Sequence, residues 1–321
     1  MLTANLKPTS QSPLYILGAG AIGSLWGAYG YQAGADIRLI LRNQQTVNDY
    51  QQHGGIHLIS AHQTLVSPVP ADYPQSISTP IQNLLITTKA PQTMDALSAI
   101  KPHIAEQAVF LLLQNGLGIA DQIRQEFPSV TVLQGSTTEG CYRQSGFEFV
   151  HAGHGHTFIG ATGGSGIRDF NALDQLAASL SFPPLNVNIS NDIDAVLWRK
   201  LAVNCAINPL TVIHHCRNGE LLHKPKALAQ MRQIVDEILA VSVALNRTHW
   251  LTNLHEYVEN VAKTTADNRS SMLQDIEAGR ETEIDAITGY LCQLAEQHNI
   301  NVPLNQEILA EIKRLSREAK H

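Results

Sequence analysis

The chain has 321 residues and a formal net charge of −6 at pH 7; 44% of its residues are hydrophobic and 16% are charged. This length and composition predict a globular protein of about two domains. The negative charge gives no electrostatic support for binding nucleic acid or an anionic membrane. The four cysteines are scattered, without a C-x-x-C motif, which predicts reduced thiols. No signal peptide is evident and no apolar run could span a bilayer, so we expect a soluble cytoplasmic protein.

The first half of the chain alternates short apolar runs with helical patterns. Continuous apolar runs of strand length are typical of strands that are covered on both faces. Strands are expected at 14–18, 36–41, 83–88, 108–113 and 130–135, and helices at 20–32, 92–101 and 118–126. This βαβ order predicts an α/β fold with a Rossmann-type, doubly wound parallel sheet.

The pattern changes near residue 146. Residues 146–160 (GFEFVHAGHGHTFIG) alternate around a glycine-containing turn and predict a β-hairpin. A helix at 169–180 and a strand at 185–190 would complete the sheet, and further helices are expected at 192–208, 226–246, 252–263, 268–278, 282–298 and 305–318. We therefore expect a Rossmann domain over residues 1–190 and an all-helical domain over 191–321. The sequence leaves open whether residues 1–13 are ordered.

The segment GAGAIG, residues 18–23, carries a G-x-G-x-x-G pattern directly after a predicted strand and at the start of a predicted helix. In this context Gly18 forms the tight turn, Gly20 lets a pyrophosphate approach the backbone, and Gly23 lets helix and strand pack closely. The predicted cofactor loop is completed by Ala19, Ala21 and Ile22. A glycine-rich turn without a ligand is the alternative.

The residue at the end of the second predicted strand indicates which of the two nicotinamide cofactors is bound. Proteins that use NAD usually place a carboxylate there for the ribose 2′-hydroxyl, whereas this chain has Arg42. A guanidinium pairs with a 2′-phosphate, so the sequence predicts NADPH. A solvated arginine is the alternative, and Arg38, inside the strand, is a poorer candidate.

Two more loops follow strands of the predicted sheet. One runs from Lys89 to Gln92 (KAPQ) and the other from Asn115 to Gly118 (NGLG). Ligands of such sheets bind outside the carboxyl ends of the strands. Lys89 and Asn115 are therefore expected to face the nicotinamide end, although each could be an ordinary loop residue.

Residues 195–211 (AVLWRKLAVNCAINPLT) predict a mostly apolar helix with one polar stripe. Lys200, Asn204 and Asn208 are spaced by four residues and so lie on one face. Pro209 disfavours helical geometry at Asn208, which places the helix end there. The alternative to a substrate-binding wall is a lysine that reaches the surface beside two satisfied amides.

Residues 267–285 (DNRSSMLQDIEAGRETEID) predict another helix. Asn268 or Asp267 suits its N-cap, and Gly279 should interrupt it. That break would let Glu283 point elsewhere than a continuous helix allows.

The chain has 14 histidines, and two groups of them could suggest a metal. The groups are His151, His154 and His156, and His214 and His215 with Cys216. Neither has a regular ligand spacing on an element with a carboxylate partner, so no metal site is predicted.

These motifs, together with TTKAPQ, LLQNGLG and NGEL (218–221), resemble the ketopantoate reductase (2-dehydropantoate 2-reductase) family, in order and over nearly the whole chain. The resemblance implies NADPH-dependent reduction of 2-dehydropantoate to (R)-pantoate, in the pathway to pantothenate and coenzyme A. It implies a site in the cleft between the two domains. Its residues would be Lys200 and Glu283 for catalysis; Asn115, Asn204, Asn208, Asn268 and Ser271 for the substrate; and the 18–23 loop, Arg42, Lys89, Gln92 and Asn115 for the cofactor.

These residue types suit hydride addition to a ketone. An ammonium can stabilise the charge that builds on the oxygen and donate the proton. Burial lowers a lysine pKa toward neutrality, and a nearby carboxylate such as Glu283 opposes that shift. A reductase for another 2-keto acid and a nucleotide-binding sensor without turnover remain alternatives. The sequence does not choose between a monomer and a homodimer.

Overall fold

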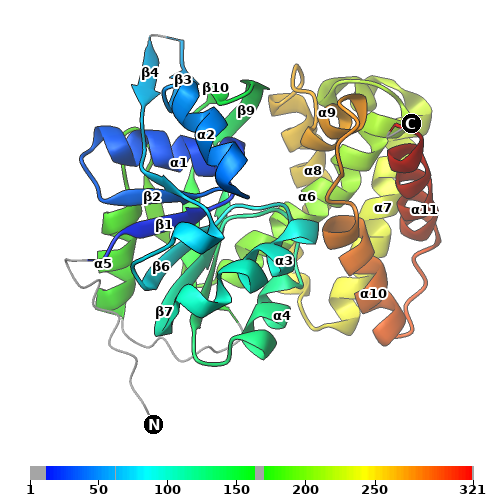
Figure 1. Cartoon of the computed structure of the whole chain (residues 1–321). Coiled ribbons are helices and arrows are strands. Elements are labelled where there is room, and N and C mark those ends of the chain that lie inside the picture. The colour runs from blue at the N-terminus through cyan, green and yellow to red at the C-terminus, as the bar shows by residue number, and fades with distance from the viewer. Residues whose placement is uncertain (1–11, 62, 163–169, 320–321) are drawn as a thin grey trace. The chain divides into compact units, whose positions relative to one another are not determined.

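The computed structural model describes residues 12–61, 63–162 and 170–319. Residues 1–11, most of the segment whose order the sequence left open, lie outside the described residues. The chain divides into two compact units (Figure 1). The first comprises residues 1–114 and 119–194, and the second comprises residues 115–118 and 195–321. The expected boundary near residue 190 thus lies close to the start of the helical part of the second unit, which also takes in the NGLG loop.

The first unit is built on a sheet in the order β12-β11-β8-β7-β6-β1-β2-β5. Its strands are β1 (Leu14–Leu17), β2 (Ile37–Ile40), β5 (Ala71–Asp72), β6 (Ile81–Ile86), β7 (Ile104–Leu112), β8 (Thr131–Thr137), β11 (Thr157–Gly160) and β12 (Val187–Ile189). The six neighbouring strands β8-β7-β6-β1-β2-β5 of this sheet are parallel to one another, as predicted. β11 pairs antiparallel with β8. The strand order reverses at β1 and β6, and ligands of open α/β sheets bind at the carboxyl ends of such strands.

Both faces of this sheet are buried, which explains the continuous apolar runs. Ile16 of β1 points into one core, whereas its neighbours Tyr15 and Leu17 point into the other. α1 (Ala21–Gln32) and α5 (Phe170–Leu180) contribute to the first core, and α3 (Ala90–Ile100) and α4 (Ile119–Glu126) contribute to the second (Figure 1). Side chains that alternate between two helical layers require apolar residues at every strand position.

A second, smaller sheet has the order β4-β3-β10-β9. Its strands are β3 (Ile56–Ile59), β4 (Thr64–Ser67), β9 (Gly140–Ser145) and β10 (Glu148–Gly153), and α2 (Gln44–Gln52) precedes it in the chain. The hairpin expected at 146–160 is wrong, because β10 pairs with β9 and β3, whereas β11 pairs with β8 of the large sheet. Between β10 and β11 the chain passes from one sheet to the other, through Gly155. At Gly155 a Cβ would lie 2.4 Å from the carbonyl carbon of Thr138.

The second unit is helical, and residues 195–319 contain no strand. Its α-helices are α6 (Ile193–Ile213, from residue 195), α7 (Pro225–Ala244), α8 (Leu254–Thr264), α9 (Ser271–Glu277), α10 (Tyr290–Gln297) and α11 (Pro303–Glu318) (Figure 1). A π-helical turn (Asp285–Gly289) and two 3-10 helices (Asn218–His223 and Thr248–Leu251) lie between them. Trp198, Ile234, Val258 and Ile312 from four of these helices share one buried core. Among the described residues, no helix is long and apolar enough to cross a membrane.

α6 does not end at Asn208 as expected, but continues through Pro209 to Ile213. Proline removes one backbone hydrogen bond of a helix. Here Ile207 and Leu210, on either side of it, are at most 1% exposed in the core. The Thr211 hydroxyl also donates to the carbonyl of Asn208, at 2.6 Å. Burial of these side chains therefore outweighs the local preference of the residue before proline.

The four cysteines are unpaired, in agreement with the prediction of reduced thiols. Burial raises the pKa of Cys205 to about 12 and that of Cys292 to about 11, so both thiols stay protonated at neutral pH. These cysteines act as small apolar core residues.

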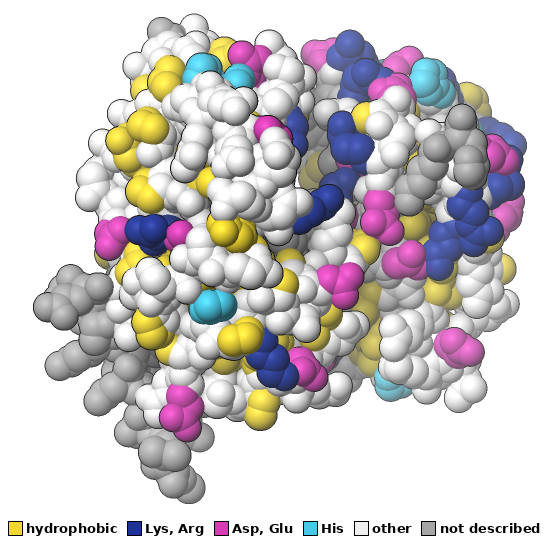
Figure 2. Space-filling model, viewed as in Figure 1, with side chains coloured by type: hydrophobic (Ala, Val, Ile, Leu, Met, Phe, Trp, Pro, Cys, Tyr) yellow, Lys and Arg dark blue, Asp and Glu magenta, His cyan; other side chains and the backbone are white. Residues whose placement is uncertain are grey.

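Charges on the surface of the helical unit are mixed in sign. Figure 2 shows its Lys and Arg side chains interspersed with Asp and Glu. Some form ion pairs, such as Lys313 with Asp285 at 2.5 Å and Arg280 with Asp275 at 3.0 Å. This face therefore presents no broad patch of a single charge.

Candidate active site

The glycine loop has three glycines with three different surroundings. Gly18 has φ +105°, and a Cβ there would lie 2.7 Å from the backbone nitrogen of Thr88. At Gly23 a Cβ would lie 2.0 Å from the Gly18 carbonyl oxygen, which also accepts a 2.7 Å hydrogen bond from the Thr87 hydroxyl. At Gly20, by contrast, no heavy atom lies within 4 Å of a Cβ position. A side chain at Gly18 or Gly23 would clash with neighbouring atoms of the fold, whereas a side chain at Gly20 would point into open space.

That space lies at the N-terminus of α1. Gly20 is the N-cap residue, no side chain caps the helix, and its first turn contains no acidic residue. The unpaired N–H groups and the helix dipole therefore give this end a partial positive charge. A side-chain-free opening before an uncapped helix fits the pyrophosphate of a dinucleotide.

The two arginines near β2 have different surroundings. Arg42 follows the strand and is exposed. Arg38 donates from Nε to Asp72 Oδ2 at 2.7 Å, so its charge is paired within the sheet. Arg38 therefore has a structural partner, whereas Arg42 is an exposed residue directly after β2.

Lys89 and Gln92 lie at the carboxyl end of β6, which pairs directly with β1. Lys89 is the N-cap of α3, and its carbonyl accepts a 2.9 Å hydrogen bond from the backbone of Gln92. Gln92 is exposed and Lys89 is partly buried. Both residues follow β6, as predicted, but the expected loop 89–92 is not a loop throughout, because α3 begins at Ala90 and includes Gln92.

Lys200, Asn204 and Asn208 lie on α6 and are partly buried. The neighbouring Leu201 and Ile207 are 3% and 1% exposed. Burial lowers the pKa of Lys200 from 10.5 to about 8, while the carboxylate of Glu283 acts in the opposite direction. The stripe therefore holds a lysine that can lose its proton near physiological pH.

Glu283 also interacts with the NGLG loop of the same unit. Asn115 Nδ2 donates to Glu283 Oε2 at 3.0 Å. The loop is held there because Leu117 N donates to the Ala286 carbonyl at 3.0 Å. Gly116 has φ +88°, and a Cβ on it would lie 2.5 Å from that carbonyl oxygen. Only glycine allows this close approach.

The predicted break before Glu283 is confirmed. α9 ends in a Schellman motif with Gly279 at φ +61°, where Gly279 N bonds to Ile276 O at 3.0 Å and Arg280 N to Asp275 O at 2.8 Å. The N-cap assignment to Asn268 or Asp267 is wrong. Ser270 is the N-cap, and its hydroxyl accepts a 3.0 Å bond from Leu273 N. Asp267, Asn268 and Ser270 have similar cap preferences, and the fold selects Ser270, which directly precedes the helix.

Asn268 and Ser271 are exposed on either side of this cap. The carbonyl of Asn268 accepts a 3.0 Å bond from the backbone of Asn218. Asn218 was not predicted as a site residue. Its Nδ2 donates to Thr265 Oγ1 at 2.9 Å, and its buried Oδ1 has no hydrogen-bond partner among the described residues. Asn218 is the first residue of the NGEL motif, and its contact with Asn268 follows from the fold and not from the motif alone.

The expectation that the hairpin histidines lack a carboxylate partner is wrong for His151. Its Nε2 lies 2.8 Å from Glu139 Oε2, and its Nδ1 lies 2.8 Å from the Tyr29 hydroxyl. The described residues contain two groups whose possible ligand atoms lie within 4.8 Å of one another: Glu139, His151 and His154, and His53, His57 and Glu148. None of these is one of the predicted catalytic, substrate or cofactor residues.

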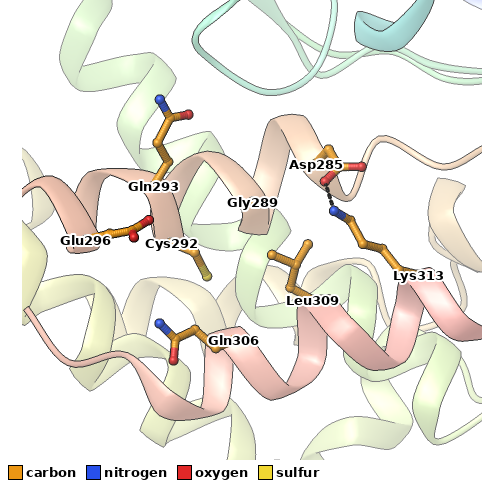
Figure 3. A pocket seen from close by; sticks show the side chains of 8 residues that line it. All are labelled: Asp285, Gly289, Cys292, Gln293, Glu296, Gln306, Leu309 and Lys313. Carbon is orange, nitrogen blue, oxygen red and sulfur yellow. Dashed lines mark ion pairs between the residues drawn. The ribbon is translucent and has the colours of Figure 1, made fainter.

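A hollow on the helical unit lies apart from the predicted site residues. It is formed by α10, α11 and the π-helical turn, with Cys292 and Leu309 facing it and the Lys313–Asp285 ion pair at one end (Figure 3). None of the residues that line it was predicted to bind substrate or cofactor.

Comparison with known proteins covers most of the chain. The family described as "Ketopantoate reductase PanE/ApbA" matches residues 14–164, and its C-terminal counterpart matches residues 192–316. The 2-dehydropantoate 2-reductases of Vibrio cholerae and Shigella flexneri are 35% and 36% identical to it, over 94% of this chain and 97% and 95% of theirs.

Solved structures agree with this relationship. A ketopantoate reductase of the PanE/ApbA family from Ralstonia eutropha superposes with a TM-score of 0.85 at 27% identity, over 96% of this chain and all of that one. D-Mandelate dehydrogenase, solved with NADH and anilino(oxo)acetate, has a TM-score of 0.89 at 23% identity over 96% of this chain and 100% of that one, and so shares the fold. By its sequence and by the family models that match it, the chain belongs to the ketopantoate reductase family of oxidoreductases.

Proposed function

We propose that this protein reduces 2-dehydropantoate to (R)-pantoate with NADPH, in the pathway to pantothenate and coenzyme A, and that Lys200 is the general acid. The observation that carries the proposal is the environment of Lys200. Its pKa is lowered to about 8 by burial beside Glu283, on the same helix as Asn204 and Asn208. A lysine with such a pKa is mostly protonated at pH 7 and is a stronger acid than a solvated one.

NADPH, when bound, supplies the hydride to the C2 ketone. The negative charge that develops on the ketone oxygen is stabilised by the Lys200 ammonium, which then donates its proton to that oxygen. The proton transfer is favourable because the partly buried ammonium loses charge in the step. After release of the hydroxy acid, Lys200 takes up a proton from solvent.

Glu283 keeps this acid charged in the resting enzyme. Its carboxylate raises the pKa of Lys200 against the effect of burial. The 3.0 Å bond from Asn115 Nδ2 occupies Glu283 Oε2 and fixes the orientation of the carboxylate. Asn115 is therefore a positioning residue for Glu283.

The substrate carries a carboxylate and a terminal hydroxyl. Asn204, Asn208, Asn268 and Ser271, all in the second unit, offer amide and hydroxyl groups that bind such groups without adding charge. A site that hydrogen-bonds a substrate hydroxyl rejects analogues that lack it far more strongly than an apolar pocket does. This supports a hydroxylated 2-keto acid as substrate.

Arg42 supports NADPH over NADH. The fold alone does not fix the cofactor, because D-mandelate dehydrogenase shares it and was solved with NADH. Arg42 is exposed at the end of β2, where a carboxylate would repel a 2′-phosphate and a guanidinium would bind it.

The test is the loss of NADPH absorbance with 2-dehydropantoate, run beside NADH and a panel of other 2-keto acids. We expect the highest kcat/KM with NADPH and 2-dehydropantoate. A higher value with another keto acid would reassign the substrate. Tight NADPH binding without oxidation by any keto acid would indicate a sensor.

A further inference from the structure

Three possible metal ligands lie together in the first unit, where α2 meets the small sheet. His53 is the C-cap residue of α2, and His57 follows on β3. Glu148, on β10, is the direct partner of His57 in the parallel β3–β10 ladder. Leu58 and Phe149, the next residues on the two strands, are buried in the core. Successive side chains of a strand alternate, so His57 and Glu148 point away from the core on one face of the sheet.

The three side chains are close enough to share one ion. Each offers one ligand atom, an imidazole nitrogen or a carboxylate oxygen, and these atoms all lie within 4.8 Å of one another. The ring centroids of His53 and His57 are 4.5 Å apart. Ligand atoms of a tetrahedral zinc ion lie about 3.5 Å from one another, so small side-chain rotations bring the three atoms to that spacing. All three residues are partly exposed, which gives access to the ion and to a water ligand.

His53 gives independent support for a ligand at this place. Its Nε2 atom is buried, and no described residue forms a hydrogen bond with it. A buried polar atom without a partner costs roughly 1–3 kcal/mol. The neutral imidazole nitrogen is the commonest metal ligand among protein side chains, so an ion bound here satisfies this atom.

The other group of possible ligands, formed by Glu139, His151 and His154, is explained by hydrogen bonds. The two ring nitrogens of His151 each lie 2.8 Å from a partner, one from Glu139 Oε2 and the other from the Tyr29 hydroxyl. These contacts account for the buried pair of His151 and Glu139 without an ion. The cluster at His53 is therefore the stronger candidate for a metal site.

We propose that His53, His57 and Glu148 bind a Zn²⁺ ion that fastens the end of α2 to the small sheet. Two imidazoles and one carboxylate are a donor set typical of zinc, whereas Mg²⁺ and Ca²⁺ prefer oxygen ligands. The ion connects residues 53–57 with a strand much later in the chain, so it stabilises the folded state. This inference does not depend on the proposed function, because none of its residues belongs to the predicted substrate or cofactor site.

The experiment is calorimetric titration of the chelator-treated full-length protein with Zn²⁺, together with thermal unfolding. We expect one tightly bound ion per chain and a Tm that rises with the Zn²⁺ concentration, whereas Mg²⁺ should not raise it. Loss of a residue that only supports a metal ligand costs about 10–100-fold in affinity. Removal of a ligand itself, in His57→Gln or Glu148→Gln, should therefore weaken Zn²⁺ binding by at least about tenfold. His154→Gln, at the exposed member of the other group, is the matched control and should bind Zn²⁺ as the wild type does.

The metal-free proteins separate the loss of a ligand from a folding defect. His57 and Glu148 are only partly buried, so without Zn²⁺ both variants should unfold at the Tm of the metal-free wild type. If one variant does not fold, the other decides the outcome. Zn²⁺ binding that is equal in the wild type and both variants, that is lost in His154→Gln instead, or that is absent from the wild type would overturn the proposal.

Discussion

Asn115 Nδ2 lies 3.0 Å from Glu283 Oε2, although 168 positions separate the two residues in the chain. The bond exists because the NGLG loop, which follows a strand of the Rossmann sheet, packs with the helical unit. Gly116 makes this possible, since its positive φ and missing side chain let the loop approach Ala286. The same carboxylate raises the pKa of Lys200. Glu283 therefore connects Asn115, to which it is hydrogen-bonded, with Lys200, whose pKa it raises.

Removal of the Lys200 ammonium should stop proton transfer while leaving cofactor binding intact. Lys200→Met should lower kcat by about 10²-fold or more, as for the loss of a general acid. The measurement is steady-state kinetics together with NADPH titration. Lys263→Met, at an exposed position on α8, is the matched control and should retain full activity. Near-normal turnover in Lys200→Met would remove this residue from the acid role.

The rate should depend on pH through Lys200. Its pKa is about 8, and only the protonated form donates, so kcat should fall as the pH rises through 8. Glu283 raises that pKa, so Glu283→Gln should move the alkaline limb of the profile to lower pH. Glu281→Gln, an exposed neighbour, should leave the limb in place. A limb that stays at the same pH in Glu283→Gln would show that the carboxylate does not act on Lys200.

Cofactor choice should depend on Arg42. Arg42→Ala removes the cation that we propose to bind the 2′-phosphate, so KM for NADPH should rise by about tenfold or more while KM for NADH changes little. NADH serves as the control within the same variant. If the ratio of the two KM values is the same as in the wild type, the 2′-phosphate is bound elsewhere.

The open space at Gly20 can be tested with a single methyl group. Gly20→Ala meets no heavy atom within 4 Å and has φ −79°, so it should fold, with a cost of about 1 kcal/mol or less at the N-cap. If the pyrophosphate occupies that space, the affinity for NADPH should nevertheless fall. Gly153→Ala, also open and without a positive φ, is the control and should alter neither property. Thermal unfolding and NADPH titration separate the two effects, and an unchanged affinity in Gly20→Ala would exclude this space for the phosphates.

Several features of the fold could be predicted because they are encoded locally. The strands β1, β6 and β7 each contain a continuous apolar run, as is typical of strands covered on both faces, and the glycine loop follows β1 directly. The break at Gly279 follows from the need for a left-handed residue at the helix end. In each case neighbouring residues along the chain determine the conformation.

The wrong predictions concern features that depend on contacts between residues far apart in the chain. Alternation predicted one hairpin over residues 146–160, but the strands found there, β10 and β11, have their partners in different sheets. α6 passes through Pro209 because Ile207 and Leu210 are buried in the helical core. β3 and β4 were not predicted, and they provide the small sheet to which β9 and β10 belong.

The sequence by itself determined the spacing of Lys200, Asn204 and Asn208 on one helix face and the glycine pattern at the start of α1, because both depend on backbone periodicity and local sterics. Only the tertiary structure decided that Asn115 bonds to Glu283, that Glu283 acts on Lys200 and that Glu148 lies opposite His57. Those relationships depend on side chains brought together across more than 80 positions of chain, and on burial, which alters a pKa only once the core has formed.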